Sequence, residues 1–396
     1  MKFSRNVENC EFSPFRKFHE AALEAEAKGR KIYHVNIGQP DIVTPQAFFD
    51  EVRRFDLPVL EYAPARGEPA LVRAIQKYYA DLNMPFEEED ILITNGGSEA
   101  LQIVINCILE PGDEILMPEP YYSNYRTMVH TVGATIRTVP TYAKDGYHYA
   151  NRELIESGIT ERTRAIMCTN PGNPTGTVLT HEEMRMMVDI AKEHNLFIIG
   201  DEAYREFVYD GGPLQSLGEF VDAPDNVVVI DTVSKRFSAC GARIGCLLTR
   251  NKELMFHAMK YAQCRLCVPT IDQLASAALY TVGSDYFTAT REEYKRRRDT
   301  TMRKIKEIPG VVCECPKGAF YIMAELPIDN SEDFQYWMLE EFEDNGETLM
   351  FTPAESFYET PGRGKNEIRL AYVLKEKDME RAMELLAKGI EQYNAR

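Results

Sequence analysis

The sequence has few of the features that mark a secreted or membrane-bound protein. Its nine cysteines are an odd number spread thinly over 396 residues, which does not look like a disulfide framework. An Asn-x-Ser/Thr glycosylation acceptor is absent, because Pro174 occupies the middle position of the near match at Asn173. Residues 1–13 contain no apolar signal core, and no run of about 18 uncharged apolar residues occurs. We therefore expect a soluble protein of a reducing compartment, most simply the cytoplasm, with no membrane partner.

Positive charge is also scarce. Lys and Arg number 45 against 62 Asp and Glu, so the formal net charge at pH 7 is −17. Such a surface repels nucleic acid and anionic membranes over most of its area, although a local basic site for a small anion is compatible with it. We expect no nucleic-acid partner.

What the sequence does have is an ordinary globular composition. Hydrophobic residues make up 44% and charged residues 27% of the chain, which excludes the disordered, collagen-like and disulfide-scaffold classes. A chain of this length predicts about two or three domains.

Short apolar runs that alternate with helical stretches predict an α/β fold in the middle of the chain. The runs are apolar throughout, as expected for strands that helices cover on both faces. Thr180 followed by Glu183 has the spacing of a capping box at the start of one helix. The strands are expected at 91–94, 115–117, 165–169, 197–200, 227–230 and 246–249, and helices at 99–109, 180–194 and 252–261. This alternation predicts a mostly parallel central sheet.

Both ends of the chain have a different pattern, typical of a smaller α+β domain built from the two termini. We expect a large domain at 46–285 and a small domain formed by 1–45 and 286–396. In the small domain, helices are expected at 15–30, 291–307, 331–345 and 375–392, and strands at 311–315, 320–325 and 368–372.

Ligands of open α/β sheets bind beyond the carboxyl ends of the strands, so the residues that follow each strand matter most. Asn95-Gly96-Gly97-Ser98 follows the first strand and opens a helix, whose free N–H groups attract phosphate; a plain glycine turn with a serine cap is the alternative. Two Asn-Pro steps after the third strand form a rigid loop that can aim the Asn173 amide at a ligand. Asp201 leaves the fourth strand and needs a cationic or hydrogen-bonding partner, unless it caps a helix.

Lys235 follows the fifth strand and lies among small residues, with Arg243 eight positions on. Most lysines are solvated surface groups. A lysine held out of bulk water near positive charge, however, can attack a carbonyl. Thr232 and Arg243 are suited to binding a phosphate.

Together these motifs resemble those of the fold-type I pyridoxal-phosphate enzymes, specifically the class I and II aminotransferases of the aspartate aminotransferase superfamily. The resemblance extends from about Asn36 to Tyr372. It implies a PLP-transferase fold of type I, with a large domain around a mostly parallel sheet, a smaller domain, and pyridoxal 5′-phosphate as cofactor. Thr232 departs from the family pattern, which usually has Ser or Gly there, but it keeps a hydroxyl.

The resemblance also implies catalytic and cofactor-binding roles. Lys235 would bind the cofactor as a Schiff base and act as general base and acid. Asp201 would pair with the pyridine nitrogen. Asn173 and Tyr204 would hydrogen-bond the 3′ oxygen of the ring, and Tyr122 would stack on its face. The remaining cofactor contacts would be Gly97, Ser98, Thr232 and Arg243 at the phosphate, together with Glu99.

Substrate and partner contacts follow from the same resemblance. Arg369 matches an arginine that binds the substrate α-carboxylate as a bidentate fork, the alternative being an exposed strand arginine. The N–H of Gly38 matches a contact to the same carboxylate, and Asn173 belongs to the substrate site as well. Tyr62 matches a tyrosine that reaches the phosphate in the neighbouring subunit, which implies a homodimer with shared active sites.

The choice of substrate depends on which residue contacts the distal end of the substrate side chain. One branch of the aspartate aminotransferases has a lysine near the start of the Gly-Gly loop that contacts the distal carboxylate, where this chain has Ser98. In another branch an arginine of the partner subunit has that role, and Arg265 lies in a comparable segment. We therefore expect Arg265 to bind the distal carboxylate of a dicarboxylic substrate, the alternative being an interface or solvated arginine.

These observations predict a ping-pong aminotransferase that moves an amino group from an L-amino acid, aspartate first, to a 2-oxo acid such as 2-oxoglutarate. Three alternatives stay open: an aminotransferase for alanine, aromatic or methionine-type substrates, a pyridoxal-phosphate-dependent carbon–sulfur β-lyase, and a non-catalytic protein that keeps the fold. We expect no metal, because the spacing of Cys264, Cys267, Cys313 and Cys315 fits zinc poorly.

Overall fold

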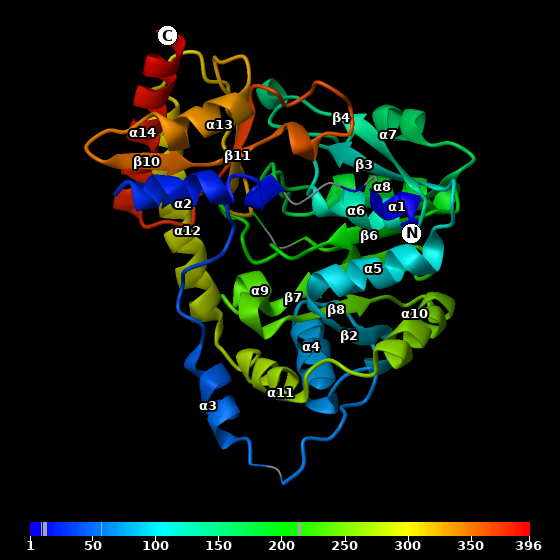
Figure 1. Cartoon of the computed structure of the whole chain (residues 1–396). Coiled ribbons are helices and arrows are strands. Elements are labelled where there is room, and N and C mark those ends of the chain that lie inside the picture. The colour runs from blue at the N-terminus through cyan, green and yellow to red at the C-terminus, as the bar shows by residue number, and fades with distance from the viewer. Residues whose placement is uncertain (9, 11–13, 57, 213–214) are drawn as a thin grey trace.

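The computed structural model describes residues 1–8, 10, 14–56, 58–212 and 215–396. A seven-stranded sheet with the order β2-β8-β7-β6-β5-β3-β4 forms the centre of the larger part of the molecule (Figure 1). Every strand is parallel to the others except β8, which is antiparallel to both of its neighbours. The strands are β2 (Ile91–Asn95), β3 (Glu114–Glu119), β4 (Thr135–Pro140), β5 (Thr163–Thr169), β6 (Phe197–Asp201), β7 (Val227–Thr232) and β8 (Ile244–Leu248). The mostly parallel α/β fold expected from the sequence is confirmed.

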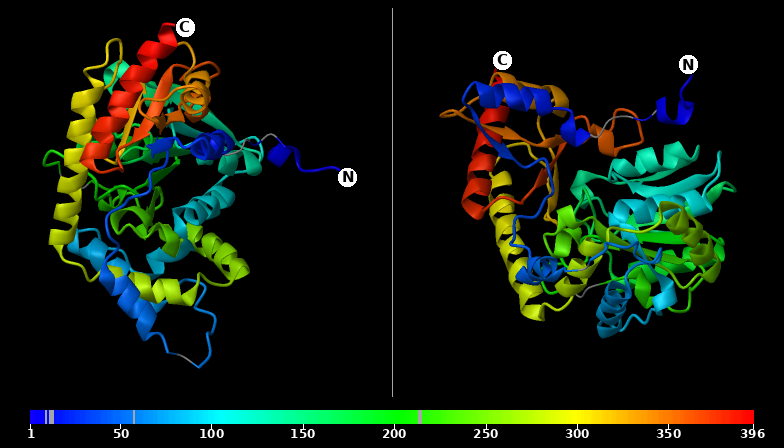
Figure 2. Two further views of the ribbon diagram at one scale, coloured as in Figure 1. Left: turned by 60° about the vertical axis from the view of Figure 1, so that its left-hand side comes forward. Right: turned by 60° about the horizontal axis from the view of Figure 1, so that its bottom comes forward.

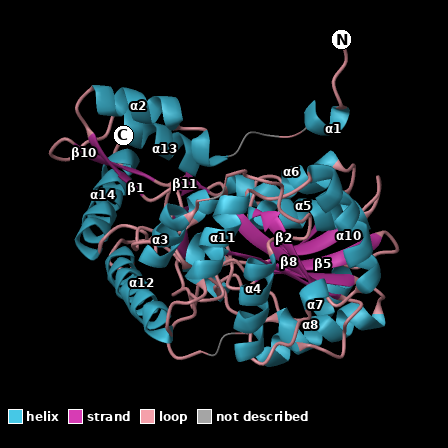
Figure 3. Cartoon of the chain, turned by 90° about the horizontal axis from the view of Figure 1, so that it is seen from below, coloured by secondary structure: helices cyan, strands magenta, loops and turns pink. Residues whose placement is uncertain are grey.

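Helices cover both faces of this sheet (Figure 3). Val227 and Val229 face one apolar core, whereas Val228 and Ile230 face the other, which explains why the strands are apolar throughout. The first core is completed by α4 (Pro69–Asp81), α7 (Arg152–Gly158), α8 (His181–Glu193) and α11 (Thr270–Leu279), and the second by α5 (Gly96–Ile108), α6 (Asn124–Thr131) and α10 (Lys252–Arg265). The short helices α1 (Arg5–Glu8), α3 (Gln46–Arg54) and α9 (Val233–Arg236) lie against α6, α11 and β8 respectively.

A smaller α+β part is built from the N-terminal segment that begins near α2 and from the C-terminal part of the chain, whereas α1 lies against α6 of the larger part. It has an antiparallel sheet of the order β11-β12-β9 and a parallel pair β1-β10. Its strands are β1 (Lys31–His34), β9 (Tyr321–Glu325), β10 (Glu347–Met350), β11 (Thr352–Pro353) and β12 (Glu367–Ala371), and its helices are α2 (His19–Ala27), α12 (Ser284–Ile305), α13 (Ser331–Glu340) and α14 (Glu376–Asn394). Figure 2 shows the long helix α12 running beside both parts of the molecule. The domain limits 46–285, 1–45 and 286–396 stay a prediction.

The structure differs from the expected elements where local signals were weak. Residues 311–315 were expected as a strand but form only one bridge, from Val312 to Glu325. Gly310 has a positive φ of +80° and Pro316 cannot donate to a ladder, so the segment between them has little room to pair. The capping box is confirmed, since Thr180 Oγ1 accepts from Glu183 N at 3.2 Å and Glu183 Oε2 accepts from Thr180 N at 2.8 Å. Within the described residues, no helix is both long and apolar enough to cross a membrane.

Candidate active site

A cavity of about 400 Å³ lies where the carboxyl ends of the central strands meet the smaller part of the molecule. Its walls come from loops far apart in the sequence. Most of the site residues expected from the sequence line it together, namely Gly38, Gly97, Ser98, Tyr122, Asn173, Asp201, Tyr204, Thr232, Lys235, Arg243 and Arg369.

The strand order explains why these loops converge. β5, β6 and β7 are neighbours, so Asn173, Asp201 and Lys235, which follow them, lie at one edge of the sheet. Arg243 instead precedes β8. Because β8 runs in the opposite direction, its amino end lies at the same edge as the carboxyl ends of the parallel strands. The one reversed strand therefore delivers Arg243 to the cavity.

The start of α5 and the Arg243 guanidinium lie in close contact. Gly96 has a φ of +75°, and a Cβ added to it would lie 2.4 Å from Arg243 Nη2. A Cβ on Gly245 would lie 2.5 Å from the N of Gly97. Only glycine at these positions lets the helix start and Arg243 approach each other, which makes a cradle of N–H groups and a guanidinium suited to a phosphate.

Lys235 is held at the cavity by one hydrogen bond and by the rigid turn around it. Its Nζ donates to the carbonyl oxygen of Gly38 at 2.9 Å. Thr232 Oγ1 accepts from the N of Ser234 at 3.1 Å and so caps the short helix α9. Next to Lys235, Arg236 forms a buried ion pair with Asp231 that ties together the two ends of this turn. The lysine amine is therefore presented to the cavity from a rigid turn.

Asp201 is a nearly buried carboxylate, with 9% of its surface exposed. Burial raises its pKa above the ordinary value, while a hydrogen bond from Tyr125 opposes that rise by favouring the charged form. The Tyr125 hydroxyl donates to Oδ2 at 2.6 Å, and the N of Ala203 donates to Oδ1 at 3.2 Å. A carboxylate fixed in this way is suited to a cationic N–H group in the cavity.

Arg369 is buried, with 2% of its surface exposed, which excludes the alternative of an exposed strand arginine. Its Nη1 donates to Asn173 Oδ1 at 3.0 Å, and its Nη2 donates to the carbonyl of Asn36 at 2.7 Å. The guanidinium lies over the Tyr321 ring, 4.4 Å from the centroid. Burial lowers the pKa of Arg369. These contacts fix the plane of the guanidinium, as bidentate binding of a carboxylate requires.

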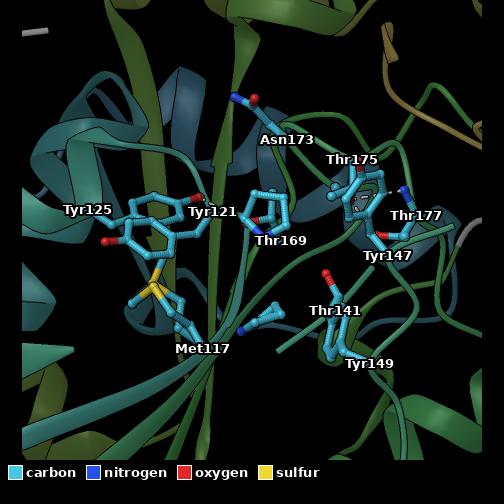
Figure 4. Close-up of a pocket in the computed structure, with 14 residues that line it drawn as sticks. Met117, Tyr121, Tyr125, Thr141, Tyr147, Tyr149, Thr169, Asn173, Thr175 and Thr177 are labelled. Atoms are coloured by element: carbon cyan, nitrogen blue, oxygen red, sulfur yellow. Dashed lines mark hydrogen bonds between the residues drawn. The ribbon is translucent and has the colours of Figure 1, made fainter. Parts of the chain in front are cut away.

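Behind Asn173 lies a second cavity of about 20 Å³, enough for about one water molecule (Figure 4). Asn173 lines both cavities, and in Figure 4 its side chain points away from the other labelled residues. The wall behind it is built mainly of aromatic and hydroxyl side chains: Tyr121, Tyr125, Thr141, Tyr147, Tyr149, Thr169, Thr175 and Thr177. This packed wall supports the loop that carries Asn173.

Three expected site residues do not line this cavity in the chain described. Tyr62 lies on the surface with 79% of its area exposed. The carboxylate of Glu99 accepts from the N of Asn95 at 2.6 Å and pairs with Arg265 Nε at 3.3 Å. The Glu99 side chain thereby satisfies a free N–H at the start of α5. Its expected contact with the cofactor stays a prediction. Arg265 also donates to the carbonyl of Ile93 at 3.1 Å. Its expected role would therefore be at the cavity of a second chain, and it stays a prediction, as does that of Tyr62.

Sequence reasoning missed several residues of the site. Tyr321 lines the cavity and shares a hydroxyl–hydroxyl hydrogen bond of 2.8 Å with Tyr204. A Cβ on Gly38 would lie 1.8 Å from the Tyr321 hydroxyl, so glycine is required there. Arg16 and Asn124 also line the cavity, and Tyr125 supports Asp201 from behind. No local pattern marks these residues, because each reaches the site through a tertiary contact.

Comparison with known proteins agrees with this geometry. Residues 36–386 match the family model of aminotransferase class I and II. The chain belongs to this family. It is 34% identical over 367 residues to a probable N-acetyl-LL-diaminopimelate aminotransferase of Bacillus subtilis, covering 91% of this chain and 89% of that protein. It is 28% identical to the aspartate aminotransferase of Bacillus subtilis over the full length of both. The structure of an alanine aminotransferase from Pyrococcus furiosus is similar, with a TM-score of 0.90, 28% identity, and coverage of 99% of this chain and 100% of that one.

Membership of the family confirms the expected class, fold type I and cofactor. The aminotransferases of this family depend on pyridoxal 5′-phosphate. The residues of the cavity fit that cofactor, since the cradle at Gly96 and Arg243 suits its phosphate and the fixed carboxylate of Asp201 suits its ring nitrogen. Among the described residues, no group of three or more His, Cys, Asp and Glu side chains is placed to hold a metal ion.

Proposed function

We propose that this aminotransferase moves the amino group of an L-amino acid, aspartate first, to a 2-oxo acid such as 2-oxoglutarate, by a ping-pong mechanism. The observation that supports transamination is the presence of Lys235, Asp201 and Arg369 in one cavity. The preference for aspartate is supported by the names of relatives, among them the aspartate aminotransferase of Bacillus subtilis.

The cofactor would be held by residues at the edge of the central sheet. Arg243, Thr232 and the start of α5 would bind its phosphate, Asp201 its ring nitrogen, and Asn173 with Tyr204 its 3′ oxygen. Tyr122 would stack on the ring. Once bound, pyridoxal 5′-phosphate supplies an electron sink that stabilises negative charge at the substrate Cα.

The chain itself supplies orientation and proton transfer. Arg369 would bind the α-carboxylate in its fixed plane, with the N–H of Gly38 as a second contact, and so align the substrate. Lys235 Nζ would remove the proton from Cα and return it as general acid. Its hydrogen bond to the Gly38 carbonyl places the amine beside the residue that contacts the carboxylate.

The absorbance spectrum of the purified holoenzyme tests this proposal. Addition of L-aspartate without any oxo acid is expected to convert the visible band of the bound cofactor to the shorter-wavelength band of its amine form. A band that responds to alanine, aromatic or methionine donors but not to aspartate would contradict the substrate assignment and keep the reaction class. The absence of a band after pyridoxal phosphate is supplied would contradict the whole assignment.

The carbon–sulfur β-lyase alternative is distinguished in the same preparation. A lyase would release pyruvate and ammonia from a cystathionine-type substrate with no second oxo acid present. An aminotransferase is expected to release neither under these conditions.

We also propose that two copies form a homodimer with shared active sites. The segment that carries Tyr62 exposes apolar side chains, with 63% of Val59 and 60% of Leu60 accessible. Exposed neighbouring apolar groups of this kind are typical of a surface that another protein covers. In a dimer, Tyr62 of one copy would reach the cofactor phosphate of the other.

A further inference from the structure

Arg16 is a charged residue of the cavity that the reaction described so far does not use. It ends the short 3₁₀ helix at Pro14–Arg16 and lines the active-site cavity. Together with Asn124 it also lines an adjoining outer hollow of about 1380 Å³. Arg16 and Asn124 therefore mark the opening through which the inner cavity meets the outer one.

Positive charge predominates around the inner cavity. Among the residues that the structure describes, its charged lining groups are the cations Arg16, Lys235, Arg243 and Arg369 and the carboxylate Asp201. This is the reverse of the whole chain, whose net charge is −17. A cavity lined in this way concentrates anions.

All of these cations except Arg16 have a partner in the proposed reaction. Lys235 is the amine that reacts, Arg243 lies at the phosphate cradle, and Arg369 is fixed for the α-carboxylate. Arg16 makes no hydrogen bond or ion pair with any residue that the structure describes. Binding of the cofactor and of the α-carboxylate would therefore leave one guanidinium of the cavity unpaired.

Two carboxylates of the outer hollow, Glu332 and Glu359, already have cationic partners. Lys17 pairs with Glu332 at 2.6 Å, and Arg126 pairs with Glu359 at 3.1 Å. Glu20 and Glu355 line the same hollow but form no ion pair with Arg16 among the described residues, so its guanidinium is available to an incoming anion.

We propose that Arg16 binds the distal carboxylate of the amino-acid substrate at the mouth of the cavity and so selects dicarboxylic amino acids. This inference rests on the proposed aspartate aminotransferase function and names a residue for its specificity. The planar guanidinium fork matches a carboxylate. Arg265, by contrast, is occupied by Glu99 and the carbonyl of Ile93 within its own chain.

The test compares L-aspartate with L-asparagine, which has nearly the same shape but no distal charge. In the holoenzyme, Arg16→Leu is expected to lower kcat/KM for aspartate by about 10- to 100-fold, the usual range for losing a charged hydrogen bond. The kcat/KM for asparagine is expected to stay within about 2-fold, because the amide does not need a cation. Arg16→Lys is expected to restore part of the loss.

Two further measurements separate a binding role from a structural one. Succinate, which carries both carboxylates but no amino group, is expected to bind Arg16→Leu more weakly than the unchanged enzyme in a calorimetric titration, whereas butyrate binding is unaffected. Lys17→Gln is the matched control, since it removes the adjacent positive charge from a residue that does not line the inner cavity. It is expected to leave aspartate turnover unchanged.

The possible results are distinguishable. Equal losses for aspartate and asparagine, or an unchanged Arg16→Leu enzyme, would overturn the role of Arg16 and leave the proposed function intact. Selective loss of aspartate in Arg265→Leu but not in Arg16→Leu would assign the distal carboxylate to Arg265 instead. An unchanged enzyme that converts alanine but no dicarboxylic amino acid would overturn the aspartate proposal and the role of Arg16 with it.

Discussion

Asp201 and Glu202 are adjacent carboxylates with opposite surroundings. Asp201 faces the cavity, whereas Glu202 is fully buried on the other side of the chain. Glu202 accepts from the Ser216 hydroxyl at 2.7 Å and from the N of Leu217 at 2.8 Å, and lies 3.7 Å from Arg205. Burial raises the pKa of Glu202 from 4.5 to about 7, because the Arg205 charge and these hydrogen bonds do not offset desolvation.

The raised pKa of Glu202 predicts that stability falls as the pH rises. The folded state holds the proton of the Glu202 carboxyl more tightly than the unfolded chain does. The stability that this protonation contributes is therefore fully present below about pH 4.5 and is lost as the pH rises through about 7. Between pH 5 and 8 the free energy of unfolding of the unchanged enzyme is expected to fall by on the order of 1–3 kcal/mol through this group. Glu202→Gln, which has no titratable group at this position, is expected not to show this fall. Urea midpoints at fixed protein concentration measure this difference.

The matched control is Glu253→Gln, because the Glu253 side chain is 87% exposed. It is expected to follow the pH dependence of the unchanged enzyme. If Glu202→Gln also followed it, the buried carboxyl would not be the group that titrates.

At the scale of elements, the contact between α5 and β8 shapes the phosphate cradle. The start of α5 lies against Arg243, and the space between them depends on Gly96. A larger residue there would meet two obstacles, the positive φ and the guanidinium itself. The antiparallel direction of β8 is what places Arg243 beside a helix that precedes it in sequence by more than a hundred residues.

Gly96→Ala is therefore expected to weaken cofactor binding as well as stability. The added Cβ would displace the Arg243 guanidinium, and we expect the Kd for pyridoxal phosphate to rise by about 10-fold, as for loss of one charged hydrogen bond. Gly112→Ala is the matched control, because Gly112 has a φ of +93° but no atom within 4 Å of an added Cβ. It imposes similar backbone strain, of about 1 kcal/mol, without touching the cradle. Equal cofactor affinity in the two variants would show that Gly96 acts only through its backbone.

At the scale of the whole molecule, the site lies between two independent sheets. The central sheet supplies Lys235 and Asp201, whereas the smaller sheet supplies Arg369 and Tyr321. The hydrogen bond from Arg369 to Asn173 joins the two parts directly. Tyr62 has 79% of its surface exposed and does not line the cavity of its own chain. A second copy of the chain would account for its exposed position.

Subunit complementation tests the shared active site. Lys235→Ala and Tyr62→Ala chains, each impaired as a homodimer, are expected to regain activity when co-expressed with different tags and purified together. In the mixed dimer, the chain that keeps Lys235 receives Tyr62 from its partner, so one of the two sites is intact. About half of the dimers in a random mixture are mixed, so about a quarter of all sites would be intact. No recovery in a confirmed mixed dimer would mean that Tyr62 does not serve the opposite site. A monomeric mass in light scattering would contradict the dimer itself.

Much of the site was predictable because its residues follow directly from buried strands. Asn173, Asp201 and Lys235 each come after an apolar run, and parallel strands place such residues at one edge. Arg369 and Gly38 were assigned only through a family resemblance, since their local surroundings resemble those of any short strand. Tyr125 and Tyr321 were not predicted, because their roles depend on hydrogen bonds to residues 76 and 117 positions away.

The sequence by itself determined the class of fold, the strands that carry the site, and the chemical identity of the lysine, carboxylate and asparagine at their ends. These are local properties, set by apolar runs, turn residues and the groups that immediately follow them. Only the tertiary structure decided that β8 is reversed, that Glu99 pairs with Arg265 outside the cavity, and that Arg16 reaches the cavity mouth. Each of these depends on contacts between distant segments, which local periodicity does not encode.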